Sequence, residues 1–122
     1  MATATGVGGV FFRARDPKAL ARWYAEVMGV PAGEEGYGII SYKEGQTLVW
    51  SVFPEDTNYF GRPEQASMIN YRVDDLDGML ERLRAAGANV DDRTEAQEFG
   101  RFGWATDPEG NRFELWEPGP GI

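Results

Sequence analysis

The sequence contains no histidine and no cysteine among its 122 residues. Histidine is the usual base for a serine nucleophile and the commonest ligand of zinc, iron and nickel. Its absence excludes a Ser-His-Asp triad, and it restricts any metal site to carboxylates, amides and water, which suit harder ions. The absence of cysteine excludes disulfides, thiolate metal sites and a cysteine nucleophile. It also fits a reducing compartment, so we expect a cytoplasmic protein.

Long apolar runs and basic clusters are missing as well. No apolar run approaches the roughly 20 residues that a membrane helix needs, and the opening MATATG has neither the basic start nor the apolar core of a signal peptide. The 12 Lys and Arg are scattered among 20 Asp and Glu, for a net charge of −8. That charge repels nucleic acid and anionic membranes, so we expect neither as a partner. It either serves solubility or attracts a cationic ligand.

The first half of the chain reads as strand, helix and further strands. Apolar and aromatic residues predict a strand over 10–14. A helix follows, because Asp16 is a favourable N-cap and Gly29 a favourable stop, with apolar residues at helical spacing between them. Alternating apolar residues predict two more strands, over 37–42 and 47–53.

The second half repeats this order. A strand is predicted over 68–73, and a helix runs from a cap at Asp75 to a stop at Gly87. A closing hairpin is predicted over 102–106 and 112–117, joined by the turn DPEG. The chain therefore contains the same βαβββ pattern twice.

The register of the repeat can be stated. Asp16 matches Asp75 at an offset of 75 − 16 = 59 residues. We expect one α+β domain with a first module over 7–54, a second over 66–118 and a polar linker around 54–63. Each module alone would leave one sheet face uncovered, so the two are expected to pair.

This pattern resembles the vicinal oxygen chelate superfamily, which includes glyoxalase I, extradiol dioxygenases, fosfomycin-resistance enzymes and bleomycin-binding proteins. The most specific part is DPEGNRFELWEP at Asp107–Pro118, and the resemblance extends over about Gly6 to Pro118. It implies two βαβββ modules that form an open, cup-shaped mixed sheet with helices outside. It also implies a ligand inside the cup and a homodimer.

The resemblance further implies four metal-ligand positions, two in each module. In this sequence they hold Gly9, Val49, Met68 and Glu114. Glycine and valine offer no side-chain donor, and a thioether is too soft for the ions that this superfamily uses. One carboxylate does not make a tight site. We therefore expect no cofactor, with a divalent metal disfavoured.

Strand alternation predicts which side chains share a face with these four positions. Together they form an aromatic and apolar surface with a few polar groups, which is the usual composition of a small-molecule site. The predicted ligand-binding residues are Phe11, Arg13, Val49, Ser51, Met68, Asn70, Arg72, Phe102, Trp104, Glu114 and Trp116, with Phe53 and Arg112 on the same face.

Several of these residues have more than one interpretation. Glu114 could contact a ligand, act as a catalytic base, or form an ion pair with Arg13 or Arg72. Trp104 and Trp116 could stack on a ligand or lie in a dimer interface. The sequence leaves these alternatives open.

Two functions follow from these interpretations. The first is a metal-free binding protein of the bleomycin-resistance kind, which would hold a small apolar, aromatic or cationic molecule. The alternative is a glyoxalase-like lyase or isomerase that uses Glu114 as general base, with or without a divalent metal. In that enzyme, Arg72 or Arg13 would hold the developing oxyanion.

Overall fold

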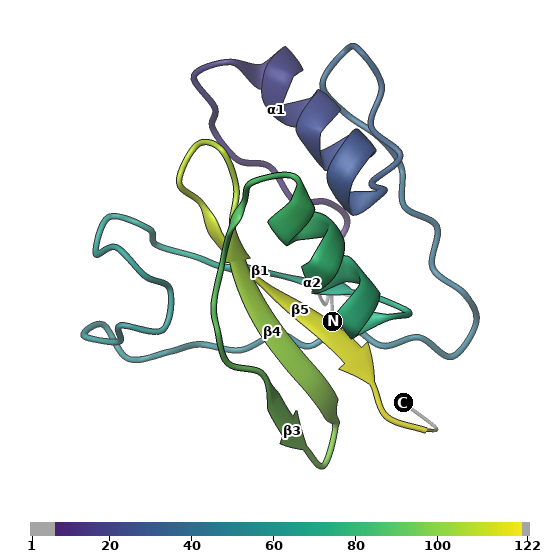
Figure 1. The fold of residues 1–122 in the computed structure, drawn as a ribbon, viewed down its shortest axis with the longest axis vertical. Helices are drawn as coiled ribbons and strands as arrows, with labels where there is room; N and C mark the ends of the chain where they lie inside the picture. The colour runs from purple at the N-terminus through teal and green to yellow at the C-terminus, as the bar shows by residue number, and fades with distance from the viewer. Residues whose placement is uncertain (1–6, 121–122) are drawn as a thin grey trace, which may run out of the picture.

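The computed structural model describes residues 7–120 and contains a small mixed sheet with helices on one side (Figure 1). The elements in chain order are α1 (Pro17–Trp23), the π-helical turn η1 (Tyr24–Met28), β1 (Ile69–Arg72), α2 (Leu76–Ala85), β2 (Asn89–Val90), β3 (Glu95–Gln97), β4 (Gly100–Thr106) and β5 (Arg112–Pro118).

The sheet is open and mixed. Its order is β1-β5-β4-β2, and β3 also pairs with β4. β1 runs parallel to β5, whereas β2, β3 and β5 are antiparallel to β4. The other edge of β1 carries no strand in the described part of the chain. An α+β fold with an open mixed sheet and outer helices is thus confirmed.

Both helices begin where the sequence predicted. The side chain of Asp16 accepts a hydrogen bond from the backbone N–H of Ala19 over 3.1 Å, and Asp75 does the same for Gly78 over 3.0 Å. These bonds satisfy N–H groups that have no partner inside a helix. The first helical segment ends at Gly29, whose φ of 76° lies in the left-handed region that glycine tolerates best.

The core lies between the helices and one face of the sheet. Gly103 of β4 lets α2 approach closely, because a Cβ at this position would come within 3.2 Å of the Leu80 side chain. The buried apolar residues of this core are Leu20, Tyr24, Met28, Val73, Leu76, Leu80, Leu83, Ala105, Phe113 and Leu115.

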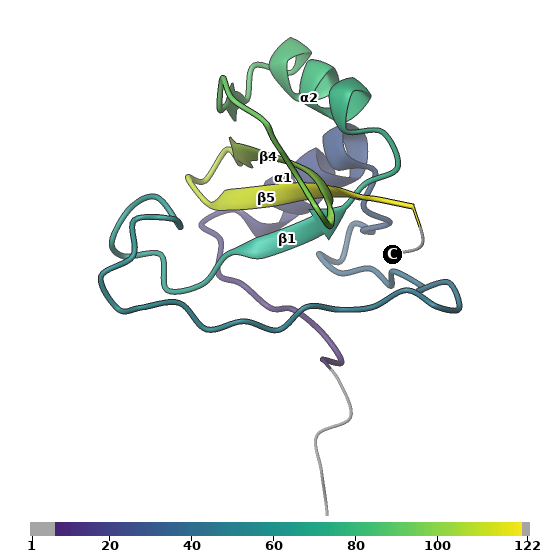
Figure 2. The same cartoon turned by 90° about the horizontal axis from the view of Figure 1, so that it is seen from below.

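The strands predicted for the first half are wrong for this structure. None of the segments 10–14, 37–42 and 47–53 is a strand, and the described first half has one isolated bridge, between Ala32 and Gly38. We call these three segments the unpaired segments. Chain from this half runs along the sheet on the side away from the helices (Figure 2). The division into modules over 7–54 and 66–118 stays a prediction.

The physical reason lies in what a strand pattern measures. Alternating apolar residues fit a pleated surface beside another strand, wherever that strand comes from. Here the side chains stay exposed: Phe11 is 96% exposed, and Trp50 and Val52 are each 75% exposed. These segments therefore have the pattern of strands but form no strand ladder in the described chain.

The helices of the described residues are all too short or too polar to cross a membrane.

Candidate functional site

Two rows of side chains cross the sheet on the face away from the helices. In the first row, Asn70 of β1, Glu114 of β5 and Trp104 of β4 are direct neighbours in the strand register. Successive residues of a strand point to opposite faces, and the alternate residues Phe113 and Leu115 lie in the helix-side core. The predicted placement of the first row on one face is confirmed.

The second row lies two residues further along β5. Arg72, Trp116 and Phe102 are neighbours there. The rings of Phe102 and Trp116 stack with centroids 6.2 Å apart and an interplanar angle of 3°. The guanidinium carbon of Arg72 lies 4.7 Å from the centroid of the Trp116 ring, within the range of a cation–π interaction. This row is a stacked, partly open platform.

Glu114 is the acceptor at the centre of the first row. Nδ2 of Asn70 donates to its Oε1 over 2.6 Å, and Nε1 of Trp104 donates to its Oε2 over 3.0 Å. The hydroxyl of Tyr59 also donates to Oε2. Glu114 is only 9% exposed and Trp104 is fully buried. We call Glu114, Asn70, Trp104 and Tyr59 the polar centre.

The sequence interpretation missed Tyr59, because it lies in the segment read as a polar linker. Its ring stacks on Phe53, with centroids 5.4 Å apart, and meets Trp104 edge-on at 6.1 Å. Burial, followed by the hydrogen bond to Glu114, raises the pKa of Tyr59 above its ordinary value. The hydroxyl is therefore protonated and donates at neutral pH. An aromatic residue in a polar segment was the available signal.

The backbone around Tyr59 is held by Arg112. Nε of Arg112 donates to the Tyr59 carbonyl over 3.0 Å, and both terminal nitrogens bind the Asp91 carboxylate over 2.9 and 3.0 Å. The Gln65 side chain exchanges two hydrogen bonds with the Arg112 backbone, over 2.7 and 2.9 Å, as a neighbouring strand would. The segment before β1 is thereby fixed to β5.

The two arginines over the Trp104 ring are engaged with other carboxylates. The guanidinium carbons of Arg93 and Arg112 lie 4.9 and 5.9 Å from the Trp104 ring centroid. Arg93 pairs with Glu95 over 2.6 Å, and Arg112 pairs with Asp91. They therefore contact the polar centre through the indole ring, and the carboxylate of Glu114 keeps neutral partners.

The interpretation of Glu114 as the ion-pair partner of Arg13 or Arg72 is wrong for the described chain. Arg13 is exposed, and a terminal nitrogen of Arg72 donates to the Thr47 carbonyl over 2.9 Å. Within residues 7–120, the salt bridges of Glu side chains are those of Glu95 and Glu109. The charge of Glu114 is thus stabilised by hydrogen bonds.

The donor set around Glu114 does not fit a divalent cation. Both carboxylate oxygens accept hydrogen bonds, and the groups around them are N–H and O–H donors. The residue at another implied ligand position, Val49, is 72% exposed and offers no donor. In residues 7–120, no three acidic side chains gather closely enough to hold a metal ion. Glu114 therefore acts in this site as a hydrogen-bond acceptor.

Of the residues predicted for this face in the unpaired segments, Phe53 stacks on Tyr59, and the other four do not join the polar centre. None of its hydrogen bonds or ring contacts includes Phe11, Arg13, Val49 or Ser51, and all four are exposed. Their predicted place beside Glu114 is wrong for this structure, because the strands that would have positioned them are not formed. Met68 directly precedes β1 and is half-buried.

The burial of Trp104 and Trp116 does not require a dimer interface. Trp104 is fully buried and Trp116 is 6% exposed in the single chain. Nε1 of Trp116 donates to the Phe99 carbonyl over 2.9 Å. Intramolecular contacts therefore account for the burial of both rings.

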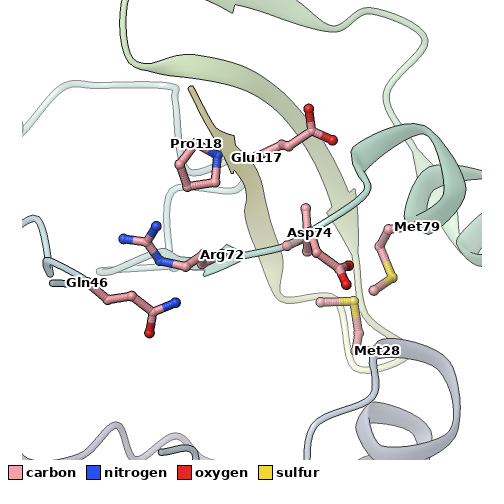
Figure 3. Close-up of a pocket in the computed structure, with 8 residues that line it drawn as sticks. Met28, Gln46, Arg72, Asp74, Met79, Glu117 and Pro118 are labelled. Carbon is pink, nitrogen blue, oxygen red and sulfur yellow. The ribbon is translucent and has the colours of Figure 1, made fainter. Parts of the chain in front are cut away.

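A pocket of about 480 Å³ opens where the second row ends, at Arg72. Figure 3 shows Arg72 and Gln46 on one side and the thioethers of Met28 and Met79 on the other. Glu117 also lines it, and its Oε1 accepts a hydrogen bond from the backbone N–H at the start of α2 over 2.9 Å. Arg72 is the residue of the second row that lines this pocket, and Met28, Val73 and Met79 belong to the helix-side core.

The turn before β5 ties the first helix to the sheet. Asp107 is buried and accepts hydrogen bonds from the backbone N–H of Glu109 and Asn111 over 2.8 and 3.0 Å. The Tyr24 hydroxyl donates to its Oδ2 over 2.7 Å. The predicted turn is confirmed by the bond from Gly110 N–H to the Asp107 carbonyl over 3.0 Å. DPEGN therefore positions β5.

Solved structures with a similar fold cover nearly all of the chain. A glyoxylase/bleomycin resistance protein/dioxygenase domain from Frankia sp. EAN1pec is 20% identical, with a TM-score of 0.61 over 98% of this chain and 96% of that one. A lactoylglutathione lyase from Agrobacterium tumefaciens is 19% identical, with a TM-score of 0.52 over 94% and 95%. TnmS3, an antibiotic binding protein from Streptomyces sp. CB03234, is 23% identical, with a TM-score of 0.50 over 85% and 88%.

No curated relative matches the chain. At these identities the structural matches establish the fold alone. The model of the glyoxalase-like domain family matches residues 9–116, which is most of the sequence. The match spans both halves of the repeat and includes the polar centre and the stacked platform. This chain belongs to the glyoxalase-like domain family, within the vicinal oxygen chelate superfamily.

Proposed function

We propose that this protein binds a small organic molecule, without a metal, on the sheet face that carries the polar centre. One observation carries the proposal: Glu114 is a nearly buried carboxylate whose partners, Asn70, Trp104 and Tyr59, are all neutral. A buried charge without a cationic partner attracts a ligand that donates hydrogen bonds or carries positive charge. The stacked platform supplies planar faces for the ligand's apolar part.

The structural neighbours are compatible with this proposal. TnmS3 is described as an antibiotic binding protein, and its fold covers most of this chain. A cytoplasmic location and the lack of nucleic-acid or membrane partners stay predictions from composition.

The test is a binding screen read by tryptophan fluorescence. Aromatic alcohols, aromatic amines and quaternary ammonium compounds are titrated into the wild type, Glu114→Gln and the exposed control Glu55→Gln. Loss of a charge-assisted hydrogen bond weakens binding by about ten-fold or more in Glu114→Gln. The control keeps the wild-type affinity. Hits that bind all three proteins equally would contradict the proposal.

Catalysis by Glu114 is the alternative function. A general base needs a lone pair that faces the substrate. Both oxygens of Glu114 already accept hydrogen bonds, and Oε2 accepts two. Binding exchanges one donor to Glu114 for another, whereas a general base needs a lone pair of Glu114 that stays free of a donor. Turnover by the wild type that is lost in a folded Glu114→Gln would favour the enzyme.

We also propose that the protein is a homodimer in which the unpaired segments pair with a second copy. These segments expose a large apolar surface, including Phe11, Ile39, Trp50 and Val52. Patches of this kind mark interaction sites on water-exposed proteins. β1 ends the sheet with a free edge, which is a template for another strand. A second copy supplies both the partner strands and the apolar cover.

A further inference from the structure

The side chain of Tyr59 occupies the space beside Glu114. Its ring lies between Phe53, which is stacked on it, and Trp104, which meets it edge-on at an interplanar angle of 87°. Its hydroxyl donates to Oε2 of Glu114 and accepts from Nε1 of Trp104 over 3.1 Å. The chain therefore places a phenol in an aromatic slot, with its oxygen between one acceptor and one donor.

The two polar partners select for a hydroxyl group. The carboxylate of Glu114 only accepts hydrogen bonds, and the indole N–H of Trp104 only donates. An ammonium group satisfies the first partner but cannot accept from the second. A ligand carboxylate cannot donate to Glu114 and is repelled by it. A hydroxyl donates and accepts through one oxygen, so it matches both partners.

Tyr59 can leave this position without unfolding its segment. Its carbonyl is held by Nε of Arg112, and its backbone N–H donates to Oγ1 of Thr57 over 3.2 Å. On the Tyr59 side, these bonds involve only backbone atoms, so they persist when the Tyr59 side chain turns. The residue is half-buried, and Asn70 on the other side of Glu114 is exposed. The slot therefore borders solvent.

We propose that Tyr59 holds the place of the ligand's own hydroxyaryl group, and that the ligands of this site are hydroxyaryl compounds that displace the Tyr59 phenol. This rests on the proposed binding function. The ligand ring lies between Phe53 and Trp104, and its hydroxyl takes over the bonds to Glu114 and Trp104. The remainder of the ligand extends across the stacked platform toward Arg72.

The experiment uses p-cresol, which is the side chain of tyrosine, and 4-methylanisole, which has the same ring but cannot donate. Both are titrated into Tyr59→Ala, and binding is followed by the indole N–H resonance of Trp104 in NMR. We expect p-cresol to bind Tyr59→Ala about ten-fold more tightly than 4-methylanisole. Phe99→Ala removes an exposed ring elsewhere and gains no binding.

A second variant tests the proposal even if Tyr59→Ala does not fold. Tyr59→Phe keeps the ring but lacks the competing hydroxyl, so p-cresol should bind it several-fold more tightly than it binds the wild type, on the order of a lost hydrogen bond. Equal affinity of p-cresol and 4-methylanisole for both variants would overturn the inference, because the slot would then be only apolar. Failure of p-cresol to bind either variant would overturn it as well.

The outcome is separable from that of the proposed function. Glu114-dependent binding of amines in preference to hydroxyaryl compounds would retain the binding function and overturn the ligand class. If no compound distinguishes the wild type from Glu114→Gln, both proposals fail.

Discussion

Trp104 and Glu114 lie directly opposite each other on β4 and β5, and the indole N–H of Trp104 donates to Oε2 of Glu114 over 3.0 Å. The pair is almost completely removed from solvent. A cross-strand pair therefore fixes the charged group of the site to the rigid part of the sheet. Asn70 and Tyr59 approach the same carboxylate from segments that are more open to solvent.

Replacing Trp104 with Phe keeps an aromatic ring but removes the N–H. Glu114 then loses one of its donors in a buried place and the smaller ring leaves a void, so the free energy of unfolding should fall by about 2–4 kcal/mol. Urea denaturation followed by far-UV circular dichroism measures the loss. Phe99→Leu is the control, because Phe99 is 55% exposed and lies outside the unpaired segments, and it should change stability by less than about 0.5 kcal/mol. Equal losses in both variants would contradict the prediction.

The hydroxyl of Tyr24 makes stability depend on alkaline pH. Burial is the main cause that raises the pKa of Tyr24 well above its ordinary value of 10.0, and the bond to Asp107 adds to it. Above pH 10 the unfolded chain loses this proton while the folded chain keeps it. The resulting stabilisation is therefore complete below pH 10, and it falls by up to about 1.4 kcal/mol per pH unit above it.

Tyr24→Phe removes this contribution. The variant should be less stable at neutral pH by about 1–2 kcal/mol, because Asp107 loses a buried partner. Its stability should also decline less steeply between pH 10 and 11.5. Tyr71, whose pKa burial raises to about 12, is present in both proteins, so part of the slope remains in the variant. Parallel curves of unfolding free energy against pH would refute the assignment.

Local signals in the sequence predicted much of this geometry. Asp16 and Asp75 were identified as helix caps, and DPEG as a turn, because each depends on neighbours a few residues away. Alternation placed Asn70, Glu114 and Trp104 on one face, since the period of a strand fixes this once the strand is known.

The parts that failed depend on distant partners. Tyr59 meets Glu114 across 55 residues, and no periodicity marks a side chain that reaches a site from a loop. The unpaired segments have the composition of strands but form no strand ladder in the described chain. An alternating pattern shows that a segment can form a strand. Whether a neighbouring strand is present to pair with it depends on the fold.

Glu109 makes stability depend on acidic pH. Its carboxylate accepts hydrogen bonds from the backbone N–H of Arg15 over 2.7 Å and of Asp16 over 2.9 Å. These bonds favour the ionised form and lower the pKa of Glu109 below its ordinary value of 4.5. The stabilisation is present above pH 4.5 and is lost as the pH falls through the lowered pKa. The two hydrogen bonds join the start of α1 to the turn before β5.

The melting temperature of Glu109→Gln should be below that of the wild type at pH 7, and the difference should shrink as the pH is lowered toward 3. The control is Glu55→Gln, which alters an exposed glutamate and should track the wild type throughout. A difference that stays constant with pH would mean that ionisation of Glu109 does not matter to the fold.

The unpaired segments and the edge of β1, which is free in the described chain, together predict a dimer. The backbone N–H and C=O groups around Trp50 and Val52 have no backbone partner among the described residues, and beside these exposed apolar side chains they favour pairing with another chain. Sedimentation velocity at about 50 µM should therefore give a dimer for the wild type, since interfaces of obligate dimers hold at such concentrations. Trp50→Asp combined with Val52→Asp places two charges in that interface and should give a monomer.

Far-UV circular dichroism distinguishes a dimer held by paired strands from a dimer held by apolar contacts alone. If the segments become strands only in the dimer, the monomeric variant should lose strand signal while α1 and α2 keep their helical signal. Phe99→Asp charges an exposed position outside these segments, so it should remain dimeric with an unchanged spectrum. A wild type that sediments as a monomer would contradict the proposed pairing, because the apolar segments would then be stable in water without a cover.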